Sequence, residues 1–151
     1  MSSSLLDGLL DPKYFVPELK GTTASEAIWE IVQLMHEGGE LRQAKPFFEA
    51  LMEREKKSPT VDDNGVAYPH ARTELVDEIM LGIGRSKKGV RFGPDDLVHL
   101  IFVIAVPRQL VNDYLICVGA LARTLRPEGT REALLAAATP AEFIARLRKR
   151  G

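Results

Sequence analysis

The apolar stretch at residues 97–106 constrains the fold of this chain more than any other part of its sequence. His99 is the one polar side chain within it, and Pro107 follows it directly. The stretch is far too short to cross a bilayer as a helix. A strand covered on both faces carries apolar side chains at successive positions, and proline, which has no amide hydrogen for a sheet ladder, suits its end. Residues 98–106 therefore predict a central strand with layers packed on both faces of its sheet.

The rest of the sequence supplies further strands and the helices to cover such a sheet. Shorter segments predict strands at residues 14–16 and 78–83. Helical spacing of apolar residues predicts helices at residues 24–37, 46–56, 110–125, 130–138 and from 140 onward. Helices alternate with strands early and fill the C-terminal third, which indicates an α/β fold with helices on both faces of the sheet.

Two of these helix starts carry capping signals. Thr23 is followed three positions later by Glu26, and Thr139 is followed by Pro140 and Glu142. In such a capping box the threonine side chain accepts a backbone amide hydrogen of the first turn, and the glutamate reaches back to the amide of the cap. Proline is well suited to the first helical position. Both starts are therefore expected close to these residues.

Composition and charge favour one cytoplasmic domain. At 151 residues the chain suits a single domain, residues 1–151, and its formal net charge of −1 provides no field to recruit nucleic acid or an anionic membrane. Cys117 is the only cysteine and lies in an apolar run, so we expect a buried thiol and no intramolecular disulfide. The N-terminal segment lacks the basic region of a secretory signal peptide. We therefore expect a cytoplasmic protein that does not insert into the membrane.

The three histidines occupy different settings in the sequence. His36 falls near the end of a helix and His99 lies within the central strand, where structural roles are expected. No cysteine or acidic neighbours stand at ligand spacing, so neither indicates a metal site. His70 follows Pro69 after a loop of small and polar residues, and the fixed dihedral angle of proline gives it a stiff approach. Position alone leaves a surface residue and an active histidine about equally open.

Three features around His70 occur in the order found in one known family. They are the segment 54–56 (Arg-Glu-Lys), the segment 64–70 (Asn-Gly-Val-Ala-Tyr-Pro-His) and the apolar strand that ends at Pro107. With these features the chain resembles the enzyme IIA domains of the fructose–mannitol class in the bacterial phosphoenolpyruvate-dependent phosphotransferase system. It is similar above all to the stand-alone nitrogen-regulatory branch. The resemblance extends over residues 10–147.

This resemblance implies a fold, a site and partners. The fold would be a three-layer α/β/α sandwich around a mixed sheet of four or five strands. His70 would accept a phosphoryl group on Nε2, with Arg54 as the neighbouring cation. The donor would be an HPr-type phosphocarrier protein, and the recipient an enzyme IIB or a regulated protein, with an output in nitrogen or metabolic regulation or in sugar uptake. No cofactor and no metal are implied.

The residues are suited to this chemistry in their own right. Imidazole has an unperturbed pKa of about 6.5 and is a competent nucleophile when neutral. Phosphoryl transfer depends mainly on in-line positioning and on stabilising charge on three oxygens, which the forked guanidinium of Arg54 can do. Thr60 and Asn64 are candidate neutral donors to the same oxygens, or alternatively residues of the turn that an Asn-Gly sequence favours.

Several positions depart from the pattern of the family. Tyr68 stands where relatives usually have an aliphatic residue, and Ala71 stands where they have glycine. Tyr114 stands where relatives commonly have a second histidine. A phenol donates a hydrogen bond but cannot become cationic, so Tyr114 is a weaker phosphate-stabilising candidate than histidine, and Arg72 is a candidate to compensate. Asp62 and Asp63 would repel a dianion at His70 unless they point away from it.

These departures leave two functions open. The first is a phosphoryl carrier that uses His70. The second is a phosphorylation-silent interaction module of the same fold, which binds a protein partner through the surface around His70. The sequence contains no serine-hydrolase elbow, Walker A loop or zinc-peptidase helix, which argues against an independent metabolic hydrolase.

Overall fold

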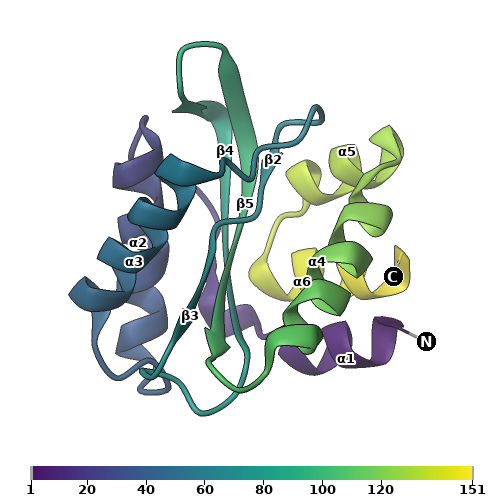
Figure 1. Cartoon of the computed structure of the whole chain (residues 1–151). Helices are drawn as coiled ribbons and strands as arrows, with labels where there is room; N and C mark the ends of the chain where they lie inside the picture. The colour runs from purple at the N-terminus through teal and green to yellow at the C-terminus, as the bar shows by residue number, and fades with distance from the viewer. Residues whose placement is uncertain (1, 151) are drawn as a thin grey trace.

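The computed structural model describes residues 2–150, and of residues 2–5, 111, 113 and 114 it describes the backbone alone. A five-stranded mixed sheet lies between two layers of helices (Figure 1), so the three-layer α/β/α sandwich is confirmed. The elements are α1 (Ser2–Leu9), the 3-10 helix η1 (Pro12–Tyr14), β1 (Phe15–Val16), α2 (Ala24–Glu37), α3 (Ala44–Lys57), β2 (Val66–Ala67), β3 (His70–Thr73), β4 (Met80–Phe92), β5 (Asp96–Pro107), α4 (Val111–Leu125), α5 (Glu128–Ala136) and α6 (Pro140–Arg150).

The sheet is built around β5. Its strand order is β1-β4-β5-β2, and β3 pairs with β5 farther along the same edge as β2. β4 and β5 form an antiparallel hairpin, whereas β1, β2 and β3 run parallel to the strands they pair with. In β5 every residue from Leu100 to Pro107 is buried, as predicted for a central strand covered on both faces.

The β4–β5 hairpin is longer than the sequence pattern predicts. The pattern predicts a strand that ends at Ile83, but β4 continues to Phe92, and β5 begins at Asp96, two residues before the predicted start. The register shifts between Arg85 and Val90, which marks a bulge. Lys87 and Lys88 lie within this bulge and are exposed. Because this part of β4 is polar, a search for apolar segments does not identify it as a strand.

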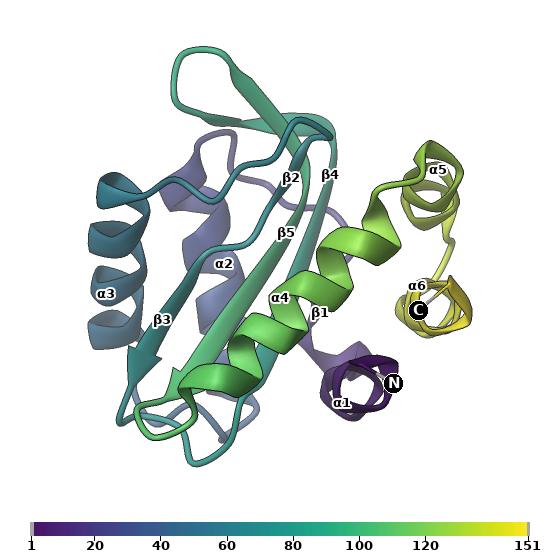
Figure 2. The same ribbon diagram turned by 45° about the vertical axis from the view of Figure 1, so that its right-hand side comes forward.

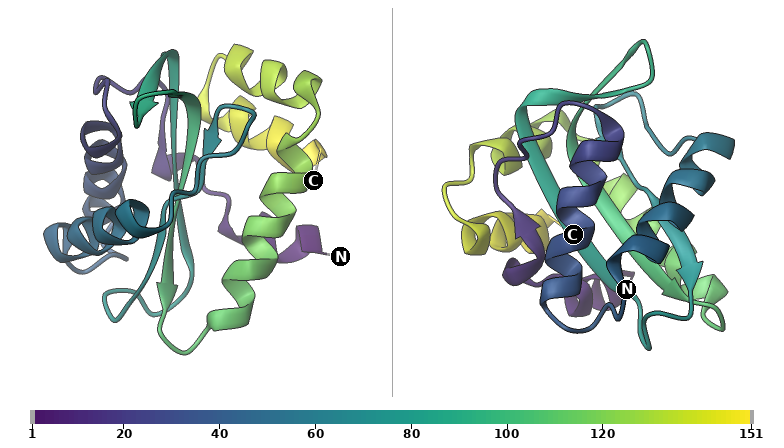
Figure 3. Two further views of the ribbon diagram at one scale, coloured as in Figure 1. Left: turned by 45° about the horizontal axis from the view of Figure 1, so that its top comes forward. Right: turned by 90° about the vertical axis from the view of Figure 1, so that its left-hand side faces the viewer.

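Helices α2 and α3 cover one face of the sheet (Figure 3). α2 begins at the predicted capping box. Its apolar face approaches β4 so closely that a Cβ atom at Gly82 would lie 2.6 Å from Sδ of Met35. At Gly84 a Cβ atom would lie 2.7 Å from Cδ1 of Ile31. These two strand glycines therefore allow the helix to pack directly on the sheet.

Helices α1, α4, α5 and α6 cover the other face, and α4 crosses it diagonally (Figure 2). Phe15 of β1, Phe102 of β5 and Phe143 of α6 are buried in this layer. The rings of Phe15 and Phe143 stack with their centroids 4.2 Å apart. α6 begins at Pro140, as its capping signal predicts.

Three helices differ from their predictions. α1 is not predicted, although leucines at positions 5, 6, 9 and 10 recur at helical spacing, because the segment is short and Asp7 and Gly8 interrupt its apolar run. Leu6 within this helix and Leu10 just after it are buried. α3 begins two residues before Pro46, which lies in the first turn, where the missing amide hydrogen leaves no helical bond unmade. α5 begins at Glu128, directly after Pro127, and not at the predicted residue 130.

Candidate functional site

His70 is the first residue of β3, at the edge of the sheet. Side chains alternate along this edge: Tyr68 packs into the core beneath α4, and Ala71 packs into the core beneath α2 and α3. By this alternation His70 belongs to the α4 side, where it is half-buried. Arg54 from the end of α3 reaches its ring, so the two helical layers meet at this histidine.

Two of the contacts that the His70 ring makes constrain its tautomer. Nδ1 lies 2.9 Å from the backbone oxygen of Tyr68, and Nε2 lies 3.3 Å from Nη2 of Arg54. A carbonyl oxygen can only accept, so Nδ1 carries the proton and donates it. A guanidinium can only donate, so Nε2 presents its lone pair to Arg54. The neighbours thus select the tautomer in which Nε2 is unprotonated.

A pocket of about 540 Å³ opens beside this histidine. α3 lines one side with residues spaced three and four positions apart, which share a face of a helix: Ala50, Glu53, Arg54 and Lys57. β3 lines the other side with His70, Ala71 and Arg72. The pocket is therefore formed where the C-terminal end of α3 packs against the start of β3.

The lining of the pocket is predominantly cationic. Arg54, Lys57 and Arg72 contribute positive charges, and Glu53 is the one carboxylate among the lining residues. Glu53 lies 3.4 Å from Nζ of Lys57, but both side chains are well exposed, and such surface ion pairs are weak. Arg72 stands two residues after His70 on β3, so both side chains project to the same side of the strand. The pocket therefore suits an anionic group.

Thr60 is not among the residues that line the pocket. Its backbone amide and its hydroxyl each donate to the carboxylate of Glu55, the buried neighbour of Arg54, over 2.8 Å. The Thr60 hydroxyl oxygen also accepts the amide hydrogen of Tyr68 at 3.1 Å. The hydroxyl is thus engaged in holding the loop before His70.

Asn64 and the two loop aspartates also stand apart from the pocket. Oδ1 of Asp62 accepts the amide hydrogens of Asn64 and Val66, at 2.8 and 3.0 Å, and so closes the turn before β2. Asn64 and Asp63 are exposed, and neither lines the pocket. The carboxylate of Asp62 is committed to this turn, so these aspartates do not project into the space beside His70.

The two tyrosines that depart from the family pattern have different settings. Tyr68 is buried and stacks on Phe102 with ring centroids 6.0 Å apart. Burial raises the pKa of the Tyr68 phenol well above its ordinary value, and the nearby carboxylate of Asp62 adds to the rise. Tyr68 is therefore neutral, and its backbone carbonyl is what contacts His70. Tyr114 belongs to α4, but its side chain lies outside the described residues.

Other side chains that often carry chemistry have structural settings here. Nδ1 of His36 donates to the carbonyl of Leu41 at 2.8 Å, and Nδ1 of His99 donates to the carbonyl of Ser86 at 2.9 Å. Cys117 is buried, as predicted. Over the described part of the chain, no group of three histidine, cysteine or acidic side chains is arranged to hold a metal. Nor does that part contain a helix long and apolar enough to cross a membrane.

Sequence reasoning missed two contributions to this site. Lys57 follows Arg54 by three positions on the same helix face, and this spacing was the available signal. Glu55 belongs to the recognised Arg-Glu pair, but its contact with Thr60 depends on the path of the loop after α3. Residue types alone do not specify that path.

Comparisons with known proteins agree with this fold. The sequence family described as "Phosphoenolpyruvate-dependent sugar phosphotransferase system, EIIA 2" matches residues 8–150. The fructose-specific EIIA component of Haloferax volcanii is 33% identical over 117 residues, which cover 76% of each chain. The fructose-specific EIIABC component of Bacillus subtilis is 34% identical over 110 residues, which are 72% of this chain but only 17% of that longer protein.

Solved structures of enzyme IIA proteins have the same fold as this chain. The nitrogen regulatory protein IIA-Ntr from Neisseria meningitidis superposes with a TM-score of 0.85 at 26% identity, covering 95% of this chain and 99% of that one. Mannitol enzyme IIA from Escherichia coli, in a complex with phosphorylated enzyme IIB, superposes with a TM-score of 0.79 at 25% identity, covering 93% and 97%. Because the family match spans nearly all of the residues, the chain belongs to the EIIA type 2 family of the phosphoenolpyruvate-dependent sugar phosphotransferase system.

Proposed function

We propose that this protein is a phosphoryl carrier that receives a phosphoryl group on Nε2 of His70 from an HPr-type protein and passes it on. The observation that carries the proposal is the pair of contacts on His70. The carbonyl of Tyr68 holds the proton on Nδ1, and Arg54 lies against the unprotonated Nε2. A nucleophile needs such an unprotonated nitrogen, and the cationic pocket that His70 lines can receive the phosphoryl group.

The transfer step follows from this arrangement. The lone pair of Nε2 forms a bond to phosphorus while the bond between phosphorus and the donor's nitrogen breaks, and the donor nitrogen keeps that electron pair. The His70 ring becomes positive, and Nδ1 still donates its proton to the Tyr68 carbonyl. Arg54 moves from Nε2 onto the phosphoryl oxygens, where a charged fork of donors stabilises them. Arg72 and Lys57 add positive charge to the same pocket.

The surface around His70 suits exchange with protein partners. Leu115 and Ile116 lie near the start of α4 with 57% and 45% of their surfaces exposed. α4 begins four residues after Pro107, and Pro107 pairs with Thr73 at the end of β3, so these apolar side chains share one end of the sheet with His70. Exposed apolar groups around a polar centre are typical of protein interfaces.

The recipient is an enzyme IIB or a regulated protein, with sugar uptake or nitrogen and metabolic regulation as the output. Mannitol enzyme IIA of Escherichia coli forms a complex with phosphorylated enzyme IIB, and the relatives include both fructose-specific and nitrogen-regulatory proteins. The phosphoryl group of the proposed donor comes ultimately from phosphoenolpyruvate, a cytoplasmic metabolite, so we place the protein in the cytoplasm.

Intact-protein mass spectrometry tests the carrier function. The protein is incubated with phosphoenolpyruvate, enzyme I and an HPr-type protein, alongside the variants His70→Ala and His99→Ala. We expect an acid-labile gain of one phosphoryl group in the wild type and in His99→Ala. In the wild type His99 is hydrogen-bonded to the carbonyl of Ser86 and has a structural setting. We expect no gain in His70→Ala.

A chain that takes up no phosphoryl group from cognate donors would contradict the carrier function. It would leave the second interpretation, a phosphorylation-silent module that binds its partner through the same surface. Uptake that persists in His70→Ala would place the chemistry at another residue.

A further inference from the structure

The loop between α3 and His70 is tied to the histidine through a continuous series of hydrogen bonds. The carboxylate of Glu55 accepts two hydrogen bonds from Thr60, each 2.8 Å long. The Thr60 hydroxyl oxygen accepts the amide hydrogen of Tyr68, and the carbonyl of Tyr68 accepts the Nδ1 hydrogen of His70. The series therefore begins on the helix that carries Arg54 and ends on the ring that Arg54 contacts.

The donors and acceptors in this series are fully determined. A carboxylate can only accept, so the hydroxyl hydrogen of Thr60 points to Glu55. The Thr60 oxygen is then left as the acceptor for the amide of Tyr68, since a backbone amide can only donate. The peptide groups that flank Tyr68 are thus fixed on one side by Thr60 and on the other by His70. Glu55 is buried, and a buried carboxylate needs these bonds to offset its lost hydration.

We propose that Thr60, held by Glu55, is a positioning residue that fixes the Nδ1–H tautomer and the orientation of the His70 ring. This inference deepens the proposed function and rests on it for the transfer step, but the tautomer is a property of the unphosphorylated protein. The tautomer of a histidine is set by the hydrogen bond that its other nitrogen makes. The carbonyl of Tyr68 makes that bond, and Thr60 holds the residue that bears it.

This role differs from a direct contact between Thr60 and phosphate. A donor to the phosphoryl oxygens would have its hydroxyl hydrogen directed into the pocket beside His70. The hydrogen of Thr60 is instead directed at Glu55, and Thr60 does not line the pocket. A hydroxyl with this role affects transfer through the histidine, and its removal must therefore change the histidine itself.

Nitrogen-15 NMR of the imidazole ring, combined with phosphoryl-transfer rates, tests the proposal. Thr60→Val keeps the shape of the side chain and removes the hydroxyl, whereas Thr60→Ser keeps the hydroxyl. Thr73→Val is the matched control, since Thr73 is a buried threonine of β3, the strand that His70 begins, and its hydroxyl oxygen accepts the amide hydrogen of Leu75. Thr60→Ala removes the same hydroxyl if the valine variant does not fold.

We expect His70 in the wild type, in Thr60→Ser and in Thr73→Val to show Nδ1 protonated and Nε2 unprotonated when the ring is neutral. In Thr60→Val we expect a mixture of tautomers and transfer slowed by about tenfold or more, because small misplacements of a reacting group have large effects on rate. A wild-type tautomer in both Thr60→Val and Thr60→Ala would overturn the proposal, even if transfer were slow. Failure of the wild type to accept a phosphoryl group, with the tautomer still dependent on Thr60, would refute the carrier function and leave the positioning role standing.

Discussion

At the scale of single residues, the cations of the His70 pocket have different relations to the nucleophile. Arg54 contacts Nε2 directly, whereas Lys57 and Arg72 line the pocket beside it. In the resting state the Arg54 guanidinium donates to the lone pair that would attack phosphorus. Arg54 is exposed and lies in the last turn of α3, so its side chain is able to shift onto an incoming anion.

Substitution of Arg54 tests whether this contact contributes to transfer. We expect Arg54→Gln to slow phosphoryl uptake by about a hundredfold, a typical effect of removing a charge-stabilising donor from a reacting centre. The rate is measured by quenched-flow sampling and intact mass. Lys56→Gln is the control, because Lys56 lies at the same helix end but does not line the pocket. Equal rates for both variants would exclude a special role for Arg54.

The order of motifs in the sequence was sufficient to place Arg54 beside His70, but not to assign the polar loop residues. A threonine and an Asn-Gly turn in the loop were equally compatible with phosphate donors and with loop structure. The structure brings neither Thr60 nor Asn64 into the pocket lining. The Thr60 hydroxyl donates to Glu55, and the backbone amide of Asn64 donates to Asp62 in the turn before β2. The group that selects the tautomer is the backbone carbonyl of Tyr68. Every residue has such a carbonyl, so a sequence motif does not reveal its role.

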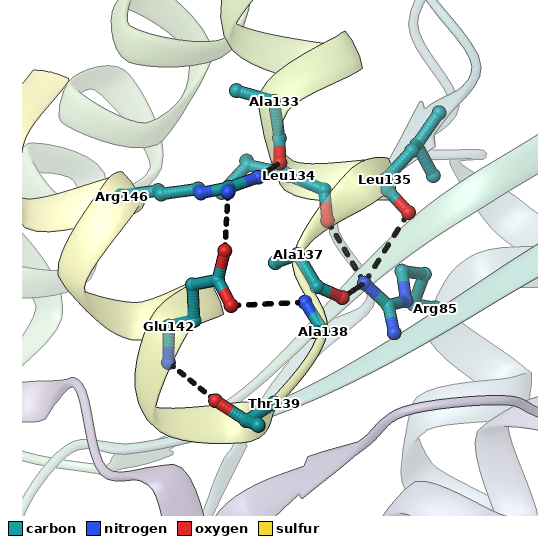
Figure 4. A network of polar contacts seen from close by, with 9 residues as sticks. All are labelled: Arg85, Ala133, Leu134, Leu135, Ala137, Ala138, Thr139, Glu142 and Arg146. Carbon is teal, nitrogen blue, oxygen red and sulfur yellow. Dashed lines mark hydrogen bonds and ion pairs between the residues drawn. The ribbon is translucent and has the colours of Figure 1, made fainter.

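At the scale of the elements, arginine side chains satisfy the C-terminal ends of several helices. Arg131 donates to the carbonyl of Leu125 at the end of α4, and Arg148 donates to the carbonyl of Leu10 just after α1. Arg85 of β4 reaches the end of α5 (Figure 4). The last carbonyls of a helix have no partner within the helix, and positive charge at that end is favoured. These contacts attach the helices of one layer to each other and to the sheet.

The contacts of Arg85 predict a large effect on stability. Its Nη1 donates to the carbonyls of Leu134 and Ala137 at 3.0 and 2.8 Å, and its Nε donates to the carbonyl of Pro17 at 2.9 Å. We expect Arg85→Met to lower the free energy of unfolding by about 2–4 kcal/mol, because buried carbonyls lose charged donors. Urea unfolding measures the change. Arg91→Met, at an exposed position of the same strand, should change stability little, and equal losses in both variants would contradict the capping role.

The capping box of α2 predicts a dependence of stability on pH. The carboxylate of Glu26 accepts the amide hydrogens of Thr22 and Thr23, at 3.0 and 3.2 Å, and these bonds hold the pKa of Glu26 below its ordinary value. A carboxyl group with a lowered pKa stabilises the fold above its unfolded pKa, and this contribution is lost as the pH falls through the folded value.

We therefore expect Glu26→Gln to lower the urea midpoint at about pH 7, and the difference from the wild type to shrink toward about pH 3. Glu37→Gln is the control, since Glu37 is an exposed residue in the last turn of the same helix, where a negative charge opposes the dipole. That variant should show no loss near neutral pH. A difference between Glu26→Gln and the wild type that stays constant with pH would mean that the ionised carboxylate is not the stabilising species.

Patterns in the sequence predicted elements best where one physical requirement dominated. The capping signals of α2 and α6 and the apolar run of β5 each depend on local chemistry, and the structure agrees with them. The second half of β4 was missed because its bulge is polar and its pairing with β5 is a tertiary contact. α1 was missed for a similar reason, since its few buried side chains acquire their environment only when α4 packs beside them.

At the scale of the whole molecule, the three layers bring chemistry and docking to one end of the sheet. His70 and Arg54 meet at the edge, and the exposed residues Leu115 and Ile116 lie on the helix that starts beside the end of β3. A second exposed leucine, Leu97, is the second residue of β5. The turn that joins β4 to β5 lies at the opposite end of the sheet (Figure 1). Among the side chains that the structure describes, Leu97 and Leu115 are thus exposed leucines of similar accessibility, and of these two Leu115 is the one near the proposed site.

Substitution of Leu115, with Leu97 as the control, distinguishes an effect on donor binding from effects on phosphoryl transfer and on folding. We expect Leu115→Ser to raise the KM for a phosphorylated HPr-type donor by roughly tenfold, since a central apolar contact of an interface typically contributes on that order. The kcat should remain close to that of the wild type, because Leu115 does not line the His70 pocket. The thermal midpoint should also change little, since more than half of the Leu115 surface is already exposed, at 57%.

Leu97→Ser removes an equally exposed leucine, at 50%, from the far end of the molecule and should leave both kinetic constants unchanged. If Leu97→Ser raised the KM as much as Leu115→Ser, the donor would have to contact both ends of the sheet or bind away from His70. A fall in kcat without a change in KM for Leu115→Ser would instead connect α4 to the geometry of the reacting histidine. Only the combination of a raised KM at Leu115 and an unchanged KM at Leu97 locates the docking surface at the end of the sheet where α3, β3 and α4 meet.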